Sequence, residues 1–419
     1  MSELDNDTTV VVTGLGAVSS LGNTAADTWH GARSGTIGIG PLTKFDPEPL
    51  AAKVASEVHD LNVGDYLERK EARRMDPFTV YAMVSAIQAL RDAGLEQPGS
   101  LQPERTGIML GVGFGGVHSF QRACEKLDQR GPDGVEPLFV PKMMANSPVG
   151  QLAIKFGITG PGLVIASACT SATDAIGRAL RCIRAGLCDV MITGGAEALM
   201  SPITFAGFGN LQALTTSFND APQRASRPFD KARSGFVLAE GAGVLLLESA
   251  DHAAARGAQA YAELAGYGAT CDAHHLTAPH PEGLGAQSAM RQAMRTAGLQ
   301  PDEVDYVNAH GTSTPLNDPI ETAAIKGVFG EHAYRLKVSS TKSMVGHLLG
   351  GSGGVEAVVT VKALQEQFYP PTANLEEPDP ACDLDYVAQR GVAAPMRAAL
   401  SNSFGFGGHN GVVAFKRAG

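Results

Sequence analysis

Several features that would point to a function class are missing from this sequence. The six cysteines form no C-x-x-C pair and are too sparse for a disulfide framework; they stand at 124, 169, 182, 188, 271 and 382. No run of about 18 uncharged apolar residues occurs, and the N-terminus MSELDNDTT lacks the cationic start and apolar run of a signal peptide. These absences predict a soluble, cytoplasmic protein in which one or two cysteines at most carry chemistry.

Basic residues are also in short supply. Lysine and arginine number 33 against 43 aspartates and glutamates, a formal net charge of −10. This balance disfavours nonspecific nucleic-acid binding, which relies on cations that meet phosphates. No Walker A sequence supports phosphoryl transfer. We therefore expect no nucleic-acid partner, no membrane partner and no metal site.

Glycine is plentiful. The chain has 50 glycines in 419 residues, well above the usual share of about 7%. They show no G-X-Y period and no Gly/Ser tract, so they are expected in turns and at close approaches of the backbone. The length is typical of two or three units of about 100 to 200 residues around a large core.

Short apolar runs alternate with helical patterns along the chain. The runs bounded by glycine or polar residues read as buried strands, at residues 9–15, 106–111, 189–194, 241–247, 260–268, 304–308 and 336–340. Between them lie stretches such as 172–183, with apolar residues on one helical face. This alternation predicts an α/β protein with a mostly parallel sheet. We place a boundary near residue 255, which gives units 1–255 and 256–419.

One glycine motif favours a different function. Gly111, Gly113 and Gly116 follow a predicted strand and satisfy the G-x-G-x-x-G rule for dinucleotide binding. In a chain this rich in glycine a chance match is expected, and the first strand of the chain does not precede it. Close packing of one loop against another is the favoured interpretation.

Cys169 is a candidate nucleophile. It lies in IASACTSA, where an apolar strand ends and a helix of small residues begins. A helix N-terminus offers unpaired N–H groups and a positive dipole end, which favour a thiolate. Taken alone, this position is better explained as a buried structural cysteine.

Two histidines and one loop support the catalytic reading. His310 in VNAHGTSTP and His347 in TKSMVGHLLGGSGG each follow a predicted strand and sit among Gly, Ser and Thr, where α/β folds present catalytic groups. The C-terminal SNSFGFGGHN offers bare N–H groups to a developing oxyanion. The protonation of the two histidines stays open at this point.

These four motifs, in this order, resemble the elongating β-ketoacyl-acyl-carrier-protein synthases of the thiolase superfamily. The resemblance includes VVVTGLGAVSSLG and ASRPFDKARSGFVLAEGAGVLLLE and covers essentially the whole chain. It implies a duplicated fold with a five-layered αβαβα core. It further implies a dimer that condenses acyl and malonyl thioesters, with phosphopantetheine supplied by an acyl carrier protein and no cofactor of its own.

The resemblance also implies residue roles. Cys169 would take the acyl chain as a thioester, and His310 and His347 would hydrogen-bond the malonyl thioester carbonyl. Lys342 would support the site electrostatically. The N–H groups of Cys169 and Phe406 would hold the tetrahedral oxyanion, and Phe406 would swing as a gate between its flanking glycines.

Further positions match substrate contacts. Thr312 and Thr314 match hydroxyls that contact the pantetheine arm, and Phe404 matches a residue of the substrate site. Phe114 stands where housekeeping enzymes often carry isoleucine, so its ring is expected to narrow or redirect the acyl tunnel.

Carrier docking is matched only in part. Lys70, Arg73 and Arg74 match a basic patch that would steer an acidic carrier helix. Asp133 and Gly134 stand where an Arg-Lys pair is usual, and the segment 215–220 lacks the usual arginine. Neutral drift or a specialised carrier explains these departures equally well.

The relatives leave one choice open. A thiolase would carry a second cysteine in the C-terminal loop, but Cys382 lies upstream of it, and a chain-length factor or scaffold subunit would lack the nucleophile. The reading is a condensing enzyme of type II fatty-acid synthesis, and the alternative is the ketosynthase subunit of a type II polyketide synthase. The dimer is accordingly a homodimer or a heterodimer with a chain-length factor.

Overall fold

Ten strands form one hydrogen-bonded sheet at the centre of the molecule. The computed structural model describes residues 8–418, so most of the acidic N-terminus lies outside it. In chain order the strands are β1 (Val10–Val18), β4 (Thr106–Gly111), β5 (Gly162–Ile165), β6 (Val190–Glu197), β7 (Gly241–Ser249), β8 (Ala262–Cys271), β9 (Tyr306–Asn308), β10 (Lys337–Ser339), β13 (Ala398–Gly405) and β14 (His409–Arg417). Two small ribbons lie outside this sheet and pair β2 (Gly40–Pro41) with β3 (Val54–Ala55) and β11 (Phe368–Tyr369) with β12 (Val392–Ala393).

The sheet consists of two sets of five strands with the same topology. The first set runs β1-β7-β6-β4-β5 and the second runs β8-β14-β13-β9-β10. In each set the first three strands pair antiparallel and the last three pair parallel. The expected predominance of parallel pairs is therefore wrong, because each set inserts its last strand beside its first. Only Val11 with Glu263 and Val12 with Ala262 join β1 to β8 and so connect the sets.

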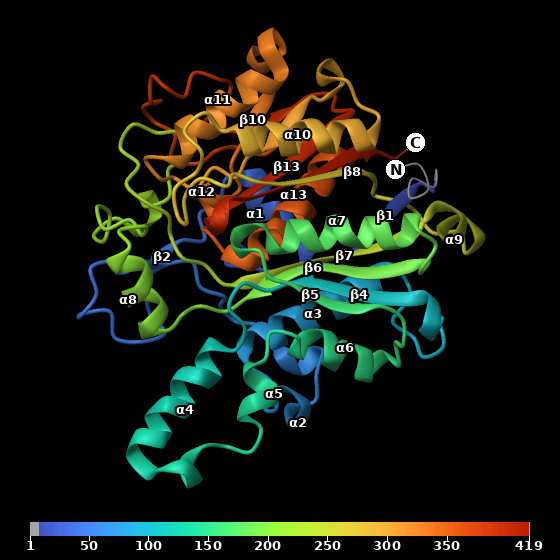
Figure 1. The fold of residues 1–419 in the computed structure, drawn as a ribbon, viewed down its shortest axis with the longest axis vertical. Coiled ribbons are helices and arrows are strands. Elements are labelled where there is room, and N and C mark those ends of the chain that lie inside the picture. Colours follow the sequence, from blue (N-terminus) through green and yellow to red (C-terminus); the bar gives the residue numbers. More distant parts are fainter. Residues whose placement is uncertain (1–7, 419) are drawn as a thin grey trace.

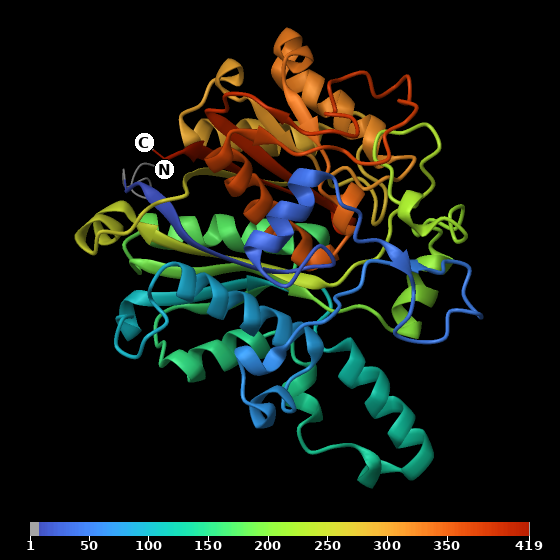
Figure 2. The same ribbon diagram turned by 180° about the vertical axis from the view of Figure 1, so that it is seen from behind.

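Helices separate and cover the two sets, which confirms the five-layered α/β architecture (Figure 1; Figure 2 shows it from behind). From one side to the other, α3 and α6 cover the first set, α7 and α13 lie between the sets, and α10 and α11 cover the second. The helices are α1 (Ala25–Ser34), α2 (Arg69–Ala72), α3 (Pro77–Asp92), α4 (Val117–Arg130), α5 (Phe139–Met143), α6 (Ser147–Phe156), α7 (Ser171–Arg184), α8 (Pro202–Asn210), α9 (Ala250–Ala255), α10 (Leu284–Ala297), α11 (Asn317–Phe329), α12 (Lys342–Val345) and α13 (Ser352–Glu366). None of the helices within residues 8–418 is long and apolar enough to cross a membrane.

Burial on both faces explains the continuous apolar runs of the strands. In β7, Leu245 and Leu247 pack into the central core with α7 and α13, whereas Val244 and Leu246 pack into the outer core with α3. Successive side chains of a strand point to opposite faces, so a strand covered by helices on both sides has no polar face. The seven predicted strands correspond to β1, β4, β6, β7, β8, β9 and β10, and the helical face at 172–183 is α7.

The connection between the two sets runs through α9. The first set ends at Ser249 and the second begins at Ala262, so the boundary expected near residue 255 falls in this connection. Its exact position stays a prediction.

Gly177 allows α7 to pack directly on β8. A Cβ at this position would lie 2.2 Å from the ring of Tyr267, far inside van der Waals contact. We expect Gly177→Ala to destabilise the fold by about 1 to 3 kcal/mol, the usual range for overpacking a core. Thermal unfolding measures this loss.

Gly150→Ala is the matched control, because Gly150 lies in α6 and its Cβ would meet no atom within 4 Å. That change should leave stability equal or raise it by up to about 1 kcal/mol through helix propensity. Equal melting temperatures for the two variants would contradict the packing argument.

Candidate active site

A strained turn places Cys169 at the start of α7. The chain leaves β5, and Ala168 adopts a left-handed conformation with φ of 52°. This conformation costs energy for a residue with a side chain, so neighbouring contacts must hold it. Ser171 Oγ donates to the Ala168 carbonyl over 2.6 Å and accepts the N–H of Ser167. The turn thereby directs the Cys169 side chain into a cavity.

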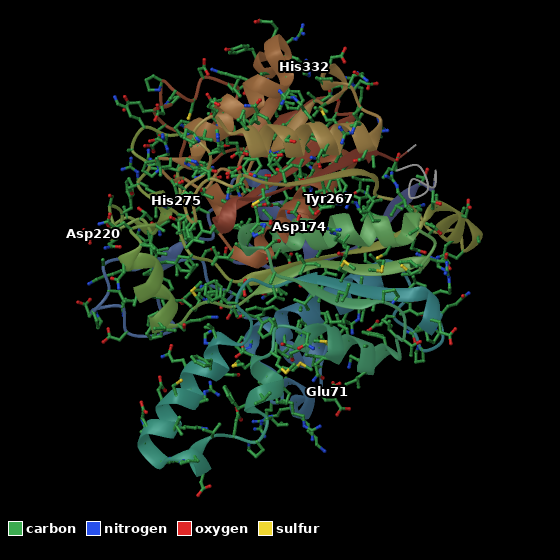
Figure 3. All side chains as sticks on the ribbon, viewed as in Figure 1. Glu71, Asp174, Asp220, Tyr267, His275 and His332 are labelled. Carbon is green, nitrogen blue, oxygen red and sulfur yellow. The ribbon has the colours of Figure 1, made fainter. Side chains whose placement is uncertain are left out.

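Asp174 braces the same turn from inside α7. Its carboxylate accepts hydrogen bonds from the hydroxyls of Ser167, Thr170 and Tyr267, the last over 2.6 Å. Tyr267 belongs to β8, so the second strand set helps to hold the turn (Figure 3). The position of Cys169 therefore depends on both sets.

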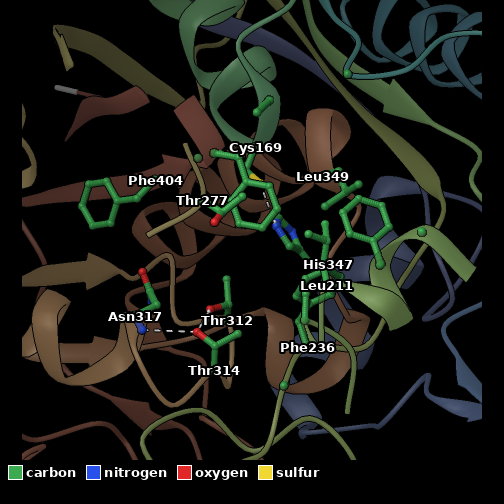
Figure 4. Close-up of a pocket in the computed structure, with 18 of the residues that line it drawn as sticks. Cys169, Leu211, Phe236, Thr277, Thr312, Thr314, Asn317, His347, Leu349 and Phe404 are labelled. Atoms are coloured by element: carbon green, nitrogen blue, oxygen red, sulfur yellow. Dashed lines mark hydrogen bonds between the residues drawn. The ribbon is translucent and has the colours of Figure 1, made fainter. Parts of the chain in front are cut away.

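The cavity in front of Cys169 has a volume of about 900 Å³. Cys169, His310 and His347 all line it and are less than 9% exposed. His347 Nε2 lies 3.1 Å from Cys169 Sγ, and the two histidine rings are 5.4 Å apart. Figure 4 shows Cys169 facing His347, with Thr312 and Thr314 on another wall. The structure thus brings together three residues that are far apart in the sequence.

Burial keeps the Cys169 thiol protonated. It raises the pKa of the thiol to about 11, although the Lys342 charge and the N–H groups of Phe406 and Cys169 oppose the rise. Desolvation therefore outweighs the helix N-terminus, contrary to the thiolate expected from the sequence. The N–H groups of Phe406 and Cys169 are thus both close to the reacting sulfur.

Lys342 and Glu356 form a buried ion pair behind His310. Both side chains are at most 2% exposed, and Lys342 Nζ also lies 3.3 Å from His310 Nδ1. Lysine can only donate, so Nδ1 of His310 accepts and the ring hydrogen resides on Nε2. Burial, with the Lys342 charge in second place, holds the pKa of His310 well below its usual range. His310 is therefore neutral with an N–H on Nε2.

A serine holds the other ring nitrogen of His347. Ser352 Oγ accepts the N–H of Leu348 and lies 2.8 Å from His347 Nδ1, so its hydroxyl hydrogen is available to that nitrogen. Burial and the Lys342 charge hold the pKa of His347 well below its usual range. Both rings are therefore neutral, and Nε2 of His347 faces the Cys169 sulfur.

Backbone bonds fix the loop that carries His310. Glu321 in α11 accepts the N–H groups of His310 and Gly311, each over 2.8 Å. The ring of Phe404 lies 5.8 Å from that of His310. A rigid loop of this kind keeps the Nε2–H group aimed without further ordering at the moment of reaction.

The other expected cavity residues also meet here. Thr312 and Thr314 share a hydrogen bond of 3.0 Å and line the cavity with Phe404 and Phe406. Phe114 lines it as well, although its side chain is 51% exposed.

The predicted docking residues lie elsewhere, on the surface. Lys70 belongs to α2, and Arg73 and Arg74 follow this helix; all three side chains are exposed.

Three further carboxylates belong to the site and are not among the residues predicted from the sequence. Glu356, Glu197 and Glu321 are each at most 1% exposed and bind groups of the site. The available signal was a single acid within an apolar stretch, as in GGAEALM and GGVEAVV, because a buried carboxylate needs a partner. Ser352 carried no comparable signal.

A metal ion would meet an unfavourable environment in this cluster. The ligand atoms of Cys169, His310 and His347 lie within 4.8 Å of one another, a spacing that a cation could bridge. However, the Lys342 ammonium lies beside His310 and lowers the pKa of both histidines. A divalent cation would feel the same repulsion.

Comparison with known proteins identifies the family. The model "Beta-ketoacyl synthase, N-terminal domain" matches residues 7–253, and "Beta-ketoacyl synthase, C-terminal domain" matches residues 261–376. The chain belongs to the beta-ketoacyl synthase family. A 3-oxoacyl-[acyl-carrier-protein] synthase 2 from Synechocystis sp. is 50% identical over 97% of this chain and 98% of its own length.

Solved structures of this family have the same fold. A structure described as the ishigamide ketosynthase/chain length factor matches with a TM-score of 0.92 at 34% identity, over 98% of this chain and 100% of its own. A type II polyketide synthase acyl-carrier protein in complex with its ketosynthase (AntDE:AntF) includes a chain that matches with a TM-score of 0.90 at 30% identity, again over 98% and 100%. The thiolase-like fold expected from the resemblance is confirmed.

The buried ion pair gives a test of the electrostatic description. Lys342→Met leaves the Glu356 charge unpaired, so we expect a loss of about 3 to 5 kcal/mol in unfolding free energy together with a loss of activity. Chemical denaturation and a product assay measure the two effects.

Lys342→Met combined with Glu356→Gln should recover most of the stability, because no buried charge remains. Activity should stay low, because His310 Nδ1 has lost its donor. Recovery of both properties by the double variant would contradict the role of Lys342 at His310.

Proposed function

We propose that this protein is a 3-oxoacyl-acyl-carrier-protein synthase of type II fatty-acid synthesis. The observation that carries the proposal is Cys169 Sγ at 3.1 Å from His347 Nε2, beside His310, in one cavity of a beta-ketoacyl synthase. The reaction is a decarboxylative Claisen condensation by a ping-pong route. It needs no cofactor bound by this chain, because the carrier protein brings the phosphopantetheine thiol.

In the first half-reaction Cys169 accepts the acyl chain. Its sulfur attacks the acyl thioester on the carrier, and the thiol proton passes to the departing pantetheine sulfur. The N–H groups of Cys169 and Phe406 stabilise the oxyanion of the tetrahedral intermediate, a role that their effect on the Cys169 pKa supports. The acyl chain then occupies the apolar end of the cavity.

In the second half-reaction the two histidines act as hydrogen-bond donors. The malonyl thioester carbonyl accepts from Nε2 of His310 and of His347, and loss of CO2 leaves an enolate held by both. One aimed donor in a dry site contributes about 3 to 4 kcal/mol. The enolate carbon attacks the acyl carbon on Cys169, and the intermediate collapses to the 3-oxoacyl product as the cysteine sulfur leaves and takes up a proton.

Phe406 is proposed as the gate between these two half-reactions. Its ring is half-buried beside the cavity, and Gly407 and Gly408 have φ values of 82° and 75°, which favour glycine. A movement of this loop would open the acyl pocket to the first substrate and close it for the second. Thr312 and Thr314, which line the same cavity, are proposed to contact the pantetheine arm.

The carrier is proposed to dock on Lys70, Arg73 and Arg74. Glu71 lies between these cations, but it is engaged by Lys155 at 3.2 Å at the lower edge of the molecule (Figure 3). Within residues 8–418, no acidic side chain lies within salt-bridge distance of the three cations. An uncompensated positive patch steers an acidic partner despite the net charge of −10.

The fatty-acid reading is favoured over the polyketide alternative by sequence identity. The relative named as 3-oxoacyl synthase 2 is 50% identical, whereas the polyketide ketosynthase structures are 34% and 30% identical. The alternative, a ketosynthase subunit that works with a chain-length factor, keeps one specific observation in its favour. The ring of Phe114 lines the cavity, where it would narrow the acyl pocket and suit a restricted set of chains.

A second copy of the chain is proposed to pair along β5. This strand ends the sheet and has hydrogen-bonded neighbours only on its β4 side in the described part of the chain. Large exposed apolar side chains gather on β5 and on α4, α5, α6 and their connections, namely Phe120, Leu127, Leu138, Val140, Met144, Ile154 and Leu163. An open strand edge beside an apolar patch is typical of an interface. In the polyketide alternative the chain-length factor would take this position.

Replacement of the nucleophile tests the mechanism. We expect Cys169→Ser to lower condensation by about 10³-fold or more, because a hydroxyl is a much weaker nucleophile in this site. Mass spectrometry of the acyl-enzyme and product formation on the carrier protein measure the effect. Cys188→Ser is the control, since Cys188 is buried in the central core. Unchanged product formation by the Cys169 variant would contradict the mechanism.

The size of the acyl pocket is tested at Phe114. We expect Phe114→Ile to raise kcat/KM for longer acyl chains by about tenfold, the effect of roughly one methylene in an apolar pocket. Assays with carrier substrates of increasing chain length measure it. Tyr334→Ile changes an aromatic residue of similar exposure that does not line the cavity. An unchanged chain-length preference for the Phe114 variant would show that this ring does not limit the pocket.

A further inference from the structure

Glu197 is a buried carboxylate that the proposed mechanism does not use. It is the last residue of β6 and its exposed fraction is 0%. Within residues 8–418, no lysine, arginine or histidine forms an ion pair with it. A buried charge without a cation must be stabilised by hydrogen bonds.

Backbone N–H groups from two separate loops supply those bonds. Oε2 accepts from Gly113 over 2.8 Å and from Gly350 over 3.2 Å, and Oε1 accepts from Phe114 over 3.2 Å. Gly113 and Phe114 follow β4 and line the acyl end of the cavity. Gly350 belongs to the turn that follows His347. One carboxylate therefore connects a substrate wall with a catalytic loop.

The two glycines leave just enough space for this connection. A Cβ on Gly113 would lie 2.6 Å from Glu197 Oε2, and a Cβ on Gly350 would lie 2.7 Å from the same oxygen. The Cβ on Gly350 would also lie 2.3 Å from the Gly113 nitrogen. Any larger residue at either position would push the loops apart or displace the carboxylate.

A row of aromatic rings forms a second connection between Phe114 and His347. The ring of Phe114 is 5.9 Å from Phe208, Phe208 is 5.6 Å from Phe236, and Phe236 is 5.2 Å from the His347 ring. A shift of the Phe114 backbone therefore changes the packing that reaches His347. The row and the carboxylate thus form two separate connections between Phe114 and the segment of His347.

We propose that Glu197 is a positioning residue that holds the acyl-pocket wall at Phe114 and the turn after His347 in one arrangement and thereby sets the acyl-chain preference. The proposal rests on the proposed function, because it assigns the same cavity to acyl chains. Burial raises the pKa of Glu197 to about 7, and the N–H groups of both loops oppose the rise. The same backbone hydrogen bonds therefore hold the two loops and stabilise the charged form of Glu197.

Glu197→Gln tests the proposal, because glutamine keeps the length but turns an amide donor toward N–H donors. We expect the ratio of kcat/KM for long and short acyl substrates to change by about tenfold, as the loss of a hydrogen bond to a charged group produces. Glu248→Gln is the matched control on the neighbouring strand, where the carboxylate binds Thr13, His252 and Arg256 far from the cavity. This control should lower the melting temperature and leave the ratio unchanged.

An equal ratio in Glu197→Gln and wild type, with lower stability, would overturn the proposal and leave Glu197 a purely structural residue. Hydrogen exchange of the wild type gives a second measurement in case the variant does not fold. Peptides that cover 112–116 and 348–352 should open with the same free energy, and independent opening would overturn the proposal. If the wild type makes no 3-oxoacyl product, the proposed function fails, whereas the exchange result still decides whether the two loops are coupled.

Discussion

The buried charge of Lys342 determines the chemical state of the whole site. Its partner Glu356 keeps the pair neutral, so the ammonium can lie beside His310 without a net charge in the interior. From there it donates to Nδ1 of His310, and after burial its charge is the next cause that lowers the pKa of both histidines. Neutral rings with Nε2–H groups are donors, which is the role that an enolate requires. A neutral ring in the other tautomer would not direct an Nε2–H group into the site.

The residues that react could be predicted from the sequence because each one follows a strand. Cys169, His310 and His347 stand among small and hydroxylated residues where the apolar runs end, and parallel strands bring such ends together. The residues that tune them could not be predicted in this way. Glu356 and Ser352 lie on α13, and their contacts depend on how this helix packs between the two strand sets. The spacing of residues along the chain does not show how this helix packs.

The fold could be predicted from the sequence to about the same extent as the active site. Strands buried on both faces appear as continuous apolar runs, and β1, β4, β6, β7, β8, β9 and β10 were located on this basis. β13 and β14 were missed as strands because Ser, Asn and Gly interrupt their apolar pattern. Because β13 and β14 were not predicted, the antiparallel pairs that they form were also absent from the prediction. The glycines of the G-x-G-x-x-G match proved to serve packing: a Cβ on Gly111 would lie 2.2 Å from the backbone of Ala172. Changes there will therefore harm folding as well as turnover.

The short hydrogen-bonded contact between β1 and β8 affects how the active site is assembled. Two residue pairs join the strand sets, so the central helices α7 and α13 provide most of the contact between them. Cys169 comes from the first set, and His310 and His347 come from the second. The distance between sulfur and imidazole is therefore a property of the docked halves and of neither half alone. Hydrogen bonds that cross between the halves, such as Tyr267 to Asp174 and Gly350 to Glu197, form only when the halves dock, so the active site is completed in that same step.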